Sequence, residues 1–558
     1  MAAVANGTEG SLSKFTPLKA QFSPPQRSDE AADVRGTDDV AVYKKPIPED
    51  EFDSDANMRV VREEWEAALP SLQAFIRIPN TTVITDKDWE TNGLLDKATK
   101  HVADWFLAQN IEGLTLEILK DPGYSPLLYV EIAATPNSTS AASTFLMYGH
   151  LDKQPHGPGW DADISPISGL VRDGKLYGRG AVDDGYHPFC YGIAIKTLQR
   201  QGIAHPRMVI LSECSEESGS RHLGHYVEKL APRIGTPSVC FCCDAGGDDY
   251  DTLWVTTSLR GTMRVKMEIT MLKNGQHSGV FGGALPDPFR VLRLLLNRIE
   301  DPVSGKIKLP ELHTKIPVEK QQDMKALADT KGYVPGVSEQ LVEGARPSTE
   351  DSFQMRVNTS WAPSMTVCGF EGLPNVAMAS PTIHPSVRVM LVIRIPPLVD
   401  ADIAVAAVKD VLETDPPYGA KVDATVTGYC GWNAPELKPN MKRALEKSCQ
   451  TYWGNPIAKN CAGGGIPLMN MLSEMFPEAS ILCTGALGPG GNMHGPNEFL
   501  HLEHVQKLTA SLSMTMGILQ PDKKWPDDVP RPEILGGKKP RYCFRMPELM
   551  VGQCPCCM

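Results

Sequence analysis

Long apolar runs are missing from this 558-residue chain, and no stretch approaches the roughly 18 consecutive apolar residues that a membrane-spanning helix needs. The first residues, MAAVANGTEGSLSKF, have no basic segment followed by an apolar one, which is not typical of a secretory signal. Positive charge is not in excess either, since 55 Lys and Arg face 67 Asp and Glu. These absences argue against membrane insertion, secretion and a nucleic-acid surface, and we expect a cytoplasmic protein.

Cysteine is present, but not in a pattern that indicates disulfides. Fourteen cysteines are spread through a large chain, which favours free thiols in a reducing compartment. One group lies in the apolar run SVCFCCDAGG and is typical of the inside of a strand. Another group ends the chain, but Pro555 stands fourth from the end, so a prenylation motif is excluded. Acylation or metal binding stays open at Cys554, Cys556 and Cys557.

The length exceeds what one hydrophobic core usually supports, so we expect two globular units. Residues 1–57 are rich in Pro, Ser, Asp and Glu with little periodicity, and we predict a disordered segment. Residues 58–257 alternate amphipathic helices with strand-like runs, which predicts an α/β layered sheet. Residues 258–428 follow a β-α-β-β-α-β order and predict an inserted α+β domain. The α/β rhythm resumes over 429–520, and 521–558 form a C-terminal tail.

Acidic and histidine side chains follow the apolar runs of the predicted α/β sheet. In an open α/β sheet, ligands bind beyond the carboxyl ends of the strands, so we expect these segments to converge on one site. Taken singly, each acid would more often be a solvated loop residue. The candidates are His150 and Asp152 in FLMYGHLD, Asp183 in LYGRGAVDDG, Glu216 and Glu217 in VILSECSEESGS, Asp244 in CFCCDAGG, and His494 in LGPGGNMHGPNE.

Imidazole and carboxylate ligands suit Zn²⁺ or Mn²⁺, and a carboxylate shared between two ions reduces their mutual repulsion. Asp183 is the candidate for that shared ligand. The Asp152 carboxylate is placed to accept the second ring N–H of His150 and so to orient the imidazole. Of the adjacent acids we assign Glu217 to the metal and Glu216 to proton transfer, because neighbours at a strand end point in different directions.

The ordered set of motifs resembles a known family. HLD, LYGRGAVDDG, EESGS, the Asp244 segment, QHSGVFGG and NMHGPNE are similar, in this order, to the di-zinc metallopeptidase family of carnosinases, cytosolic non-specific dipeptidases, aminoacylases and glutamate carboxypeptidases. The resemblance extends from about Met58 to Leu519 and is nearest to the dipeptidase branch. It implies an α/β catalytic domain, with a mixed sheet flanked by helices, that is split by a ferredoxin-like lid or dimerisation domain.

The resemblance also implies roles for individual residues. Two divalent ions per chain, zinc or manganese, would be held by His150, Asp183 and Asp244 and by Asp183, Glu217 and His494. Glu216 would be the general base and later the general acid in the hydrolysis of a dipeptide amide bond.

Two residues of the inserted domain receive roles from the same resemblance. His277 would reach the partner's site in a homodimer and stabilise the oxyanion, the alternative being an ordinary turn residue. Arg394, in VIRIPP, resembles an arginine that binds the substrate carboxylate, the alternative being an exposed strand residue.

Two stretches depart from the family. Relatives usually carry Lys after the paired acids, where this chain has Gly185, and we expect altered packing there. CAGGGIP stands where the dipeptidase branch has Arg-Glu-Gly-Gly-Ser-Ile-Pro, so Ala462 and Gly465 replace side chains that contact substrate termini in relatives. Three functions stay open: a dipeptidase, an N-acyl amino acid amidohydrolase on the same machinery, and a non-catalytic partner subunit.

Overall fold

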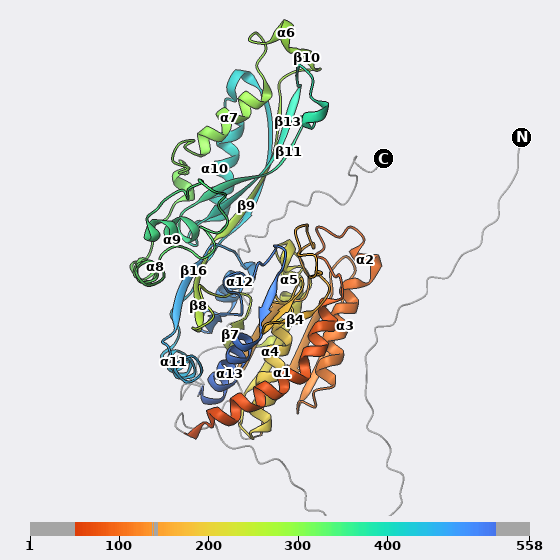
Figure 1. Ribbon diagram of the computed structural model, residues 1–558, viewed down its shortest axis with the longest axis vertical. Helices are drawn as coiled ribbons and strands as arrows, with labels where there is room; N and C mark the ends of the chain where they lie inside the picture. The colour runs from red at the N-terminus through yellow and green to blue at the C-terminus, as the bar shows by residue number, and fades with distance from the viewer. Residues whose placement is uncertain (1–50, 137, 139–142, 520–558) are drawn as a thin grey trace, which may run out of the picture. The chain divides into compact units, whose positions relative to one another are not determined.

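The computed structural model describes residues 51–136, 138 and 143–519 (Figure 1). The predicted tail 521–558, with its three terminal cysteines, lies outside this range, as does most of the predicted N-terminal segment. The first long helix, α1 (Ser54–Ile76), begins inside that segment because the Asp53 side chain accepts a hydrogen bond from the Ala56 amide at 2.9 Å and caps it. No helix in the described ranges has the length and apolar character needed to cross a bilayer.

A mixed six-stranded sheet with the order β1-β2-β6-β3-β7-β17 forms the larger part of the fold. The pairs β1–β2 and β2–β6 are antiparallel, whereas β6, β3, β7 and β17 run parallel to one another. The predicted mixed sheet is therefore confirmed. Its strands are β1 (Leu114–Leu119), β2 (Leu127–Ile132), β3 (Thr144–His150), β6 (Arg207–Glu213), β7 (Pro237–Cys242) and β17 (Ser480–Cys483).

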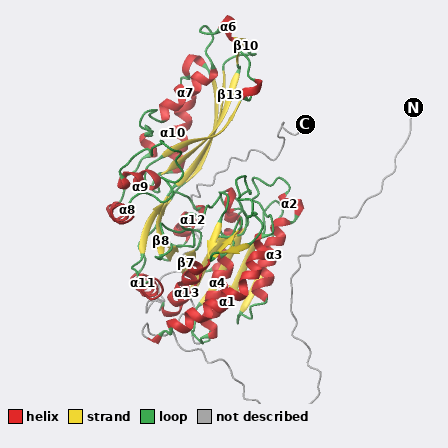
Figure 2. Cartoon of the chain, in the orientation of Figure 1, coloured by secondary structure: helices red, strands yellow, loops and turns green. Residues whose placement is uncertain are grey.

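Helices cover both faces of this sheet, because alternate strand residues enter two separate hydrophobic cores. In β3, Phe145 and Met147 join one core, whereas Leu146 and Tyr148 join the other. Figure 2 shows the helices of the first core lying against the strands. The first core includes α1, α3 (Leu94–Leu107), α4 (His187–Arg200), α11 (Pro439–Trp453) and α13 (Leu502–Ile518), and the second includes α5 (Leu223–Ile234) and α12 (Pro467–Met475).

A separate antiparallel sheet has the order β11-β13-β9-β14. Its strands are β9 (Gly261–Thr270), β11 (Ser364–Glu371), β13 (Ser386–Ile395) and β14 (Lys421–Tyr429). Figure 1 shows α7 (Pro288–Ile299) and α10 (Ala401–Glu413) along one face of this sheet. The chain order β9-α7-β11-β13-α10-β14 confirms the predicted ferredoxin-like arrangement. Two helices that the sequence analysis did not predict, α8 (Val318–Lys331) and α9 (Ser352–Ser360), lie between α7 and β11 in the chain.

The remaining strands form small sheets around these two. The sheet β15-β8-β16 joins segments on either side of the second sheet in the chain. Its strands are β15 (Trp432–Asn433), β8 (Trp254–Leu259) and β16 (Ala458–Ala462). The others are β18 (Phe499–His501), β5 (Lys175–Tyr177) and β4 (Leu170–Arg172) in one sheet and β10 (Gln276–His277) and β12 (Thr382–Ile383) in another, and the short helices are α2 (Trp89–Asn92) and α6 (Ser278–Phe281).

Candidate metal centre and substrate cleft

Three neighbouring parallel strands bring most of the predicted ligands to one edge of the large sheet. His150 is the last residue of β3, and Asp244 follows the end of β7 by two residues. Glu216 and Glu217 lie in a short 3-10 turn, Glu216–Ser218, that follows β6. Because β6, β3 and β7 are adjacent and parallel, their carboxyl ends meet at the same edge.

Asp183 lies between two histidines. Its Oδ1 is 3.2 Å from His150 Nε2, and its Oδ2 is 3.0 Å from His494 Nε2. The same His494 nitrogen is 3.0 Å from Glu217 Oε2. On the other side, His150 Nε2 is 3.8 Å from Asp244 Oδ1. The five predicted ligand side chains therefore surround one small volume.

Glu216 and Asp184 border the same volume. Glu216 Oε2 lies 4.0 Å from His150 Nε2. Two groups have potential ligand atoms that all lie within 4.8 Å of one another: His150, Asp183 and Glu217, and His150, Asp184 and Asp244. Asp184 was not among the residues predicted for the site, although it stands beside the predicted shared ligand.

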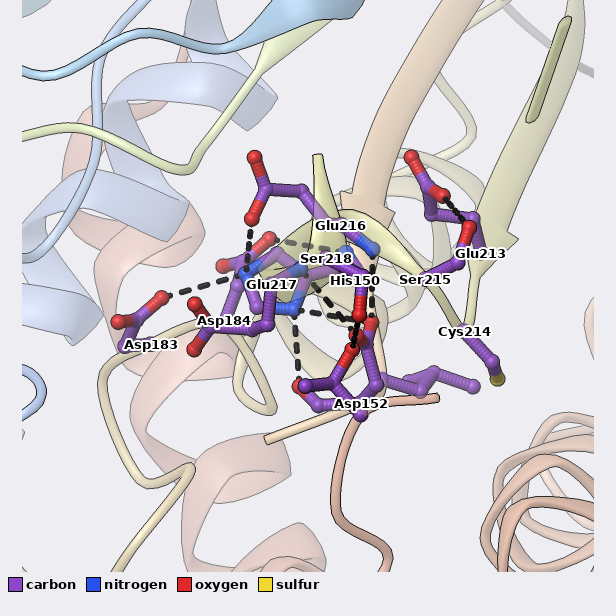
Figure 3. Close-up of polar contacts among 12 residues, drawn as sticks. His150, Asp152, Asp183, Asp184, Glu213, Cys214, Ser215, Glu216, Glu217 and Ser218 are labelled. Carbon is purple, nitrogen blue, oxygen red and sulfur yellow. Dashed lines mark hydrogen bonds and ion pairs between the residues drawn. The ribbon is translucent and has the colours of Figure 1, made fainter. Parts of the chain in front are cut away.

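Asp152 holds the turn that carries the two glutamates (Figure 3). Its carboxylate accepts hydrogen bonds from the Glu216 amide at 3.1 Å and from the Glu217 amide at 3.2 Å. His150 Nδ1 lies 3.0 Å from the backbone oxygen of Asp152 and 3.6 Å from its carboxylate. The predicted contact between ring and carboxylate is therefore the longer of the two, and the Asp152 carboxylate chiefly orients the glutamate turn.

Asp184 holds the backbone of His150 in place through a hydrogen bond. Its Oδ2 accepts a hydrogen bond from the His150 amide at 3.3 Å and lies 3.2 Å from His187 Nδ1. His187 Nε2 in turn lies 2.8 Å from the Ser212 hydroxyl. Position 149 must be glycine here, since an added Cβ would lie 2.2 Å from the His187 ring. His187 is therefore a structural residue.

A buried ion pair positions Asp183. Arg179 lies 2.7 Å from Glu498, and both side chains are almost fully buried. The other carboxylate oxygen of Glu498 accepts hydrogen bonds from the Val182 and Asp183 amides at 3.1 and 3.3 Å. The motifs LYGRG and GPNE, which are far apart in the chain, thus act together to hold the central ligand.

The centre has an excess of carboxylate groups that no Lys or Arg side chain balances among the described residues. Burial first, and then the charges of neighbouring carboxylates, raise the pKa of Glu216 and of Asp244 well above the usual range. Burial alone would lower the pKa of His150, yet its hydrogen bond to Asp183 and the nearby carboxylates hold that pKa well above its ordinary value. In the described part of the chain, no Lys or Arg forms an ion pair with any of the three predicted carboxylate ligands or with Glu216. Such a set of carboxylates and imidazoles fits two divalent cations, which would supply the missing positive charge.

A cleft of about 1280 Å³ opens onto this centre. Asp183, Glu216 and His494 line it from the large sheet, and Arg394 of β13 lines it from the ferredoxin-like sheet. Arg394 donates a hydrogen bond to the Thr262 hydroxyl at 2.7 Å. Two predicted substrate-binding residues, Arg394 and Gly465, therefore share a cleft with the metal centre.

The CAGGGIP segment is packed too closely to carry the serine found in relatives. Gly465 lines the cleft, and a Cβ at this position would lie 2.4 Å from the backbone oxygen of Arg260. Gly185 is similar, because a Cβ there would lie 2.3 Å from the Gly180 oxygen and 2.4 Å from the Phe75 ring. The backbone around Gly185 therefore leaves no room for a lysine side chain, and altered packing relative to relatives stays a prediction.

His277 does not line this cleft. It is exposed at the end of β10, where its Nδ1 accepts a hydrogen bond from the Gly279 amide at 3.1 Å. Within one chain the structure does not bring His277 together with Glu216. Its predicted action on a partner subunit stays a prediction.

Several residues of the cleft were missed by sequence reasoning. Gln154 donates a hydrogen bond to Glu217 Oε2 at 2.8 Å. Arg221, Arg264 and Tyr429 also line the cleft. The alternation of β9, in which Met263 and Val265 are buried, was the available signal that Arg264 lies on the opposite face of its sheet.

Comparison with known proteins agrees with this geometry. The family model for peptidase family M20/M25/M40 matches residues 146–516, a range that contains every predicted metal ligand. The chain is 28% identical over 429 residues to a cysteinylglycine-S-conjugate dipeptidase of Corynebacterium striatum, which covers 75% of this chain and 90% of that protein. It is 26% identical over 399 residues to a beta-Ala-His dipeptidase of Homo sapiens, which covers 67% of this chain and 73% of that protein.

The fold is also similar to the crystal structure of human carnosine dipeptidase 1, with a TM-score of 0.67, 20% sequence identity, and coverage of 83% of this chain and 98% of that one. The family match extends over most of the chain and includes both the ligand-bearing strand ends and the ferredoxin-like sheet. The chain belongs to peptidase family M20/M25/M40.

Proposed function

We propose that this chain is a di-metal exopeptidase that hydrolyses the amide bond of dipeptides or similarly small amino-acid conjugates. The observation that carries the proposal is the position of Asp183, whose two oxygens lie 3.2 and 3.0 Å from His150 and His494. A carboxylate between two ligand sets is what a two-ion centre requires. The dipeptidase names of two related proteins support the substrate class.

Two ion sites would share Asp183. His150 and Asp244 complete the first, and Glu217 and His494 complete the second, as the contacts of 3.8 and 3.0 Å favour. Zinc or manganese would suit these nitrogen and oxygen donors. When bound, the ions would lower the pKa of water and polarise the substrate carbonyl.

Glu216 would move the proton. It borders the ion sites without being needed as a ligand, and the Asp152 carboxylate fixes the direction of its backbone amide. From this position its carboxylate would take a proton from the attacking water and return that proton to the leaving amine. Arg394 would bind the carboxylate of the leaving amino acid, as an arginine fork suits a carboxylate.

The ferredoxin-like part, residues 258–428, would serve as lid and dimerisation domain, between catalytic parts 58–257 and 429–520. Its edge strand β11 leaves apolar side chains in solvent, and Val367 is 49% exposed and Phe370 39%. An exposed apolar edge strand favours pairing with another chain. In a homodimer His277 would reach the partner's cleft and stabilise the oxyanion.

An N-acyl amino acid amidohydrolase is the second candidate. The observation in its favour is the CAGGGIP segment, where Ala462 lines the cleft in place of an acidic side chain that contacts a substrate terminus in relatives. An N-acyl amino acid has no charged amino terminus, so its neutral acyl group would not need an acidic side chain at this position. The cytoplasm remains our expected location, since ten described cysteines are free thiols.

A substrate panel tests the proposal. Protein loaded with Zn²⁺ or Mn²⁺ should hydrolyse dipeptides, and the Glu216→Gln variant should lose activity by about 10²–10⁴-fold while its metal content is unchanged. Glu228→Gln, an exposed residue of α5, is the matched control and should keep full activity. Cleavage of N-acyl amino acids alone would select the second candidate. Full activity in Glu216→Gln would refute the mechanism, and no hydrolysis of any amide would favour a non-catalytic partner subunit.

A further inference from the structure

Among the described residues, two arginines of the cleft have no ion-pair partner. Arg221 and Arg264 both line the cleft with Arg394. Arg394 donates to the Thr262 hydroxyl, but neither Arg221 nor Arg264 has an ion-pair partner within residues 51–136, 138 and 143–519. Two carboxylates line the cleft outside the metal centre: Asp248, which is 2.7 Å from Arg356, and Glu339.

The strand register places two of these arginines side by side. Thr262 of β9 is opposite Arg394 of β13, and Arg264 is opposite Val392. Arg264 and Arg394 are therefore diagonal neighbours on adjacent strands, with their side chains on the same face of the sheet. Tyr429 of β14 is opposite Thr262 on the other side and completes this surface.

This surface lies close to the reacting centre. Burial raises the pKa of Tyr429, and the charges that act on its phenol include Glu216 on one side and Arg394 and Arg264 on the other. One phenol thus lies within electrostatic range of the proposed general base and of both arginines.

Arg221 adds a third positive charge from the opposite wall. It follows the glutamate turn of the large sheet by only a few residues. Burial and then the charge of Arg264 lower the pKa of its guanidinium. Two cations held together without an anion are unfavourable, so the cleft is suited to a ligand that brings negative charge.

We infer that the preferred substrate carries a second carboxylate on its leaving amino acid, which is therefore a C-terminal glutamate or aspartate. Arg394 takes the α-carboxylate, and Arg264 with Arg221 takes the side-chain carboxylate. This assignment rests on the proposed function and adds the substrate class to it. A guanidinium group donates two parallel hydrogen bonds to the two oxygens of a carboxylate, and a neutral side-chain amide cannot accept both.

The test compares substrates that differ only in that charge. The metal-loaded enzyme is assayed on Ala-Glu against Ala-Gln, on Ala-Asp against Ala-Asn, and on the matching N-acetyl amino acids. We expect kcat/KM to be at least about tenfold higher for each acidic member. In Arg264→Gln and Arg221→Gln the ratio of glutamate to glutamine should fall toward one, and Arg264→Lys should keep part of it.

Arg290→Gln is the matched control, because Arg290 is exposed on α7 and does not line the cleft. It should keep the wild-type ratio. Equal rates on acidic and amide substrates in the wild-type enzyme would overturn this inference and leave the hydrolase intact, and so would an unchanged ratio in both arginine variants. Failure to hydrolyse any member of the panel would instead contradict the proposed function. The wild-type comparison decides the question even where a variant does not fold.

Discussion

At the scale of single residues, the centre depends on acids that need not touch a metal. Asp152, Asp184 and Glu498 each accept hydrogen bonds from backbone amides of residues in the metal centre or next to it in the chain. All three carboxylates are buried. Removing a carboxylate from water is unfavourable, and the hydrogen bonds from these backbone amides offset that loss of solvation. Ligand geometry is therefore set by the backbone before an ion arrives, as precise metal sites require.

Histidine burial makes the stability of the fold sensitive to acid. His504 of α13 is 3% exposed, and its ring nitrogens lie near the backbone oxygens of Tyr250 and Gly485. Burial lowers its pKa to about 4, although those carbonyls and Asp249 act in the opposite direction. Between about pH 6.5 and 4 the unfolded chain binds the extra proton, so this residue removes up to about 3 kcal/mol of stability as the pH falls.

Replacing His504 by glutamine should remove this residue's contribution to the loss of stability at acid pH. Urea unfolding of wild type and His504→Gln at about pH 7 and pH 4.5 gives the loss of stability on acidification for each protein. The variant should lose less, because its side chain does not titrate. An equal loss in both proteins would show that His504 is protonated in the folded state.

The metal-centre candidates could be singled out from sequence because each follows an apolar run that forms a buried strand or precedes a buried helix. His150 and Asp244 are of this kind, and the structure places them 3.8 Å apart. Arg264 and Tyr429 could not be found in this way. They belong to a second sheet, and their closeness to Glu216 results from packing between elements that carry no shared sequence signal.

At the scale of elements, two ion pairs fasten the α8–α9 segment to the end of β7. Arg356 of α9 is 2.7 Å from Asp248 and largely buried, and Lys331 at the end of α8 is 2.7 Å from Asp249. The Arg356 guanidinium also donates to the backbone oxygen of Gly332. Residues 334–337, which follow α8, line the cleft. These ion pairs therefore hold one wall of the cleft in place.

Removing the buried arginine should loosen that wall. Arg356→Met leaves Asp248 buried without a partner, which typically costs about 3–5 kcal/mol. We expect faster proteolysis within residues 332–350 and a higher KM with a smaller change in kcat. Adding Asp248→Asn should restore much of the protection, since the uncompensated charge is then gone.

Lys325→Met is the matched control for that change. It breaks the Lys325–Asp329 pair of α8, in which both side chains are well exposed, and such pairs contribute about 0.5 kcal/mol or less. Proteolysis and KM should stay at wild-type values. If Arg356→Met behaves like this control, the buried pair does not hold the wall.

The element order of both sheets was predictable, whereas α8 and α9 were not. Strands such as β3 and β13 show continuous or alternating apolar residues, and α7 shows a clear helical stripe. The apolar residues of α8 lack helical periodicity, because that helix buries few side chains. It is held by an ion pair between Lys331 and Asp249, about 80 positions earlier, which local pattern does not reveal.

At the scale of the whole molecule, one predicted catalytic residue lies away from the cleft of its own chain. Glu216 and the ion ligands come from the large sheet, but His277 does not line the same cleft. If His277 acts on the partner subunit, two inactive variants should complement each other. In a mixed dimer, the His277→Ala subunit contributes Glu216 to one site. The Glu216→Gln subunit contributes His277 to that same site.

Mixing equal amounts of these variants under conditions of subunit exchange should restore activity. Random pairing puts half of the dimers in the mixed form, each with one competent site, so about a quarter of wild-type activity is expected. Each variant alone should stay inactive. No recovery despite proven exchange would show that His277 acts within its own chain or has no role in the reaction.

The most direct measurement is the metal content of the purified chain. Mass spectrometry of the wild-type protein, equilibrated with Zn²⁺ or Mn²⁺ and freed of excess ions, should find two ions per chain. Asp183→Ala should hold fewer than two and lose activity, because the carboxylate between His150 and His494 is removed. A wild-type protein that holds no ions under these conditions, or an Asp183→Ala variant that still holds two, would contradict the account.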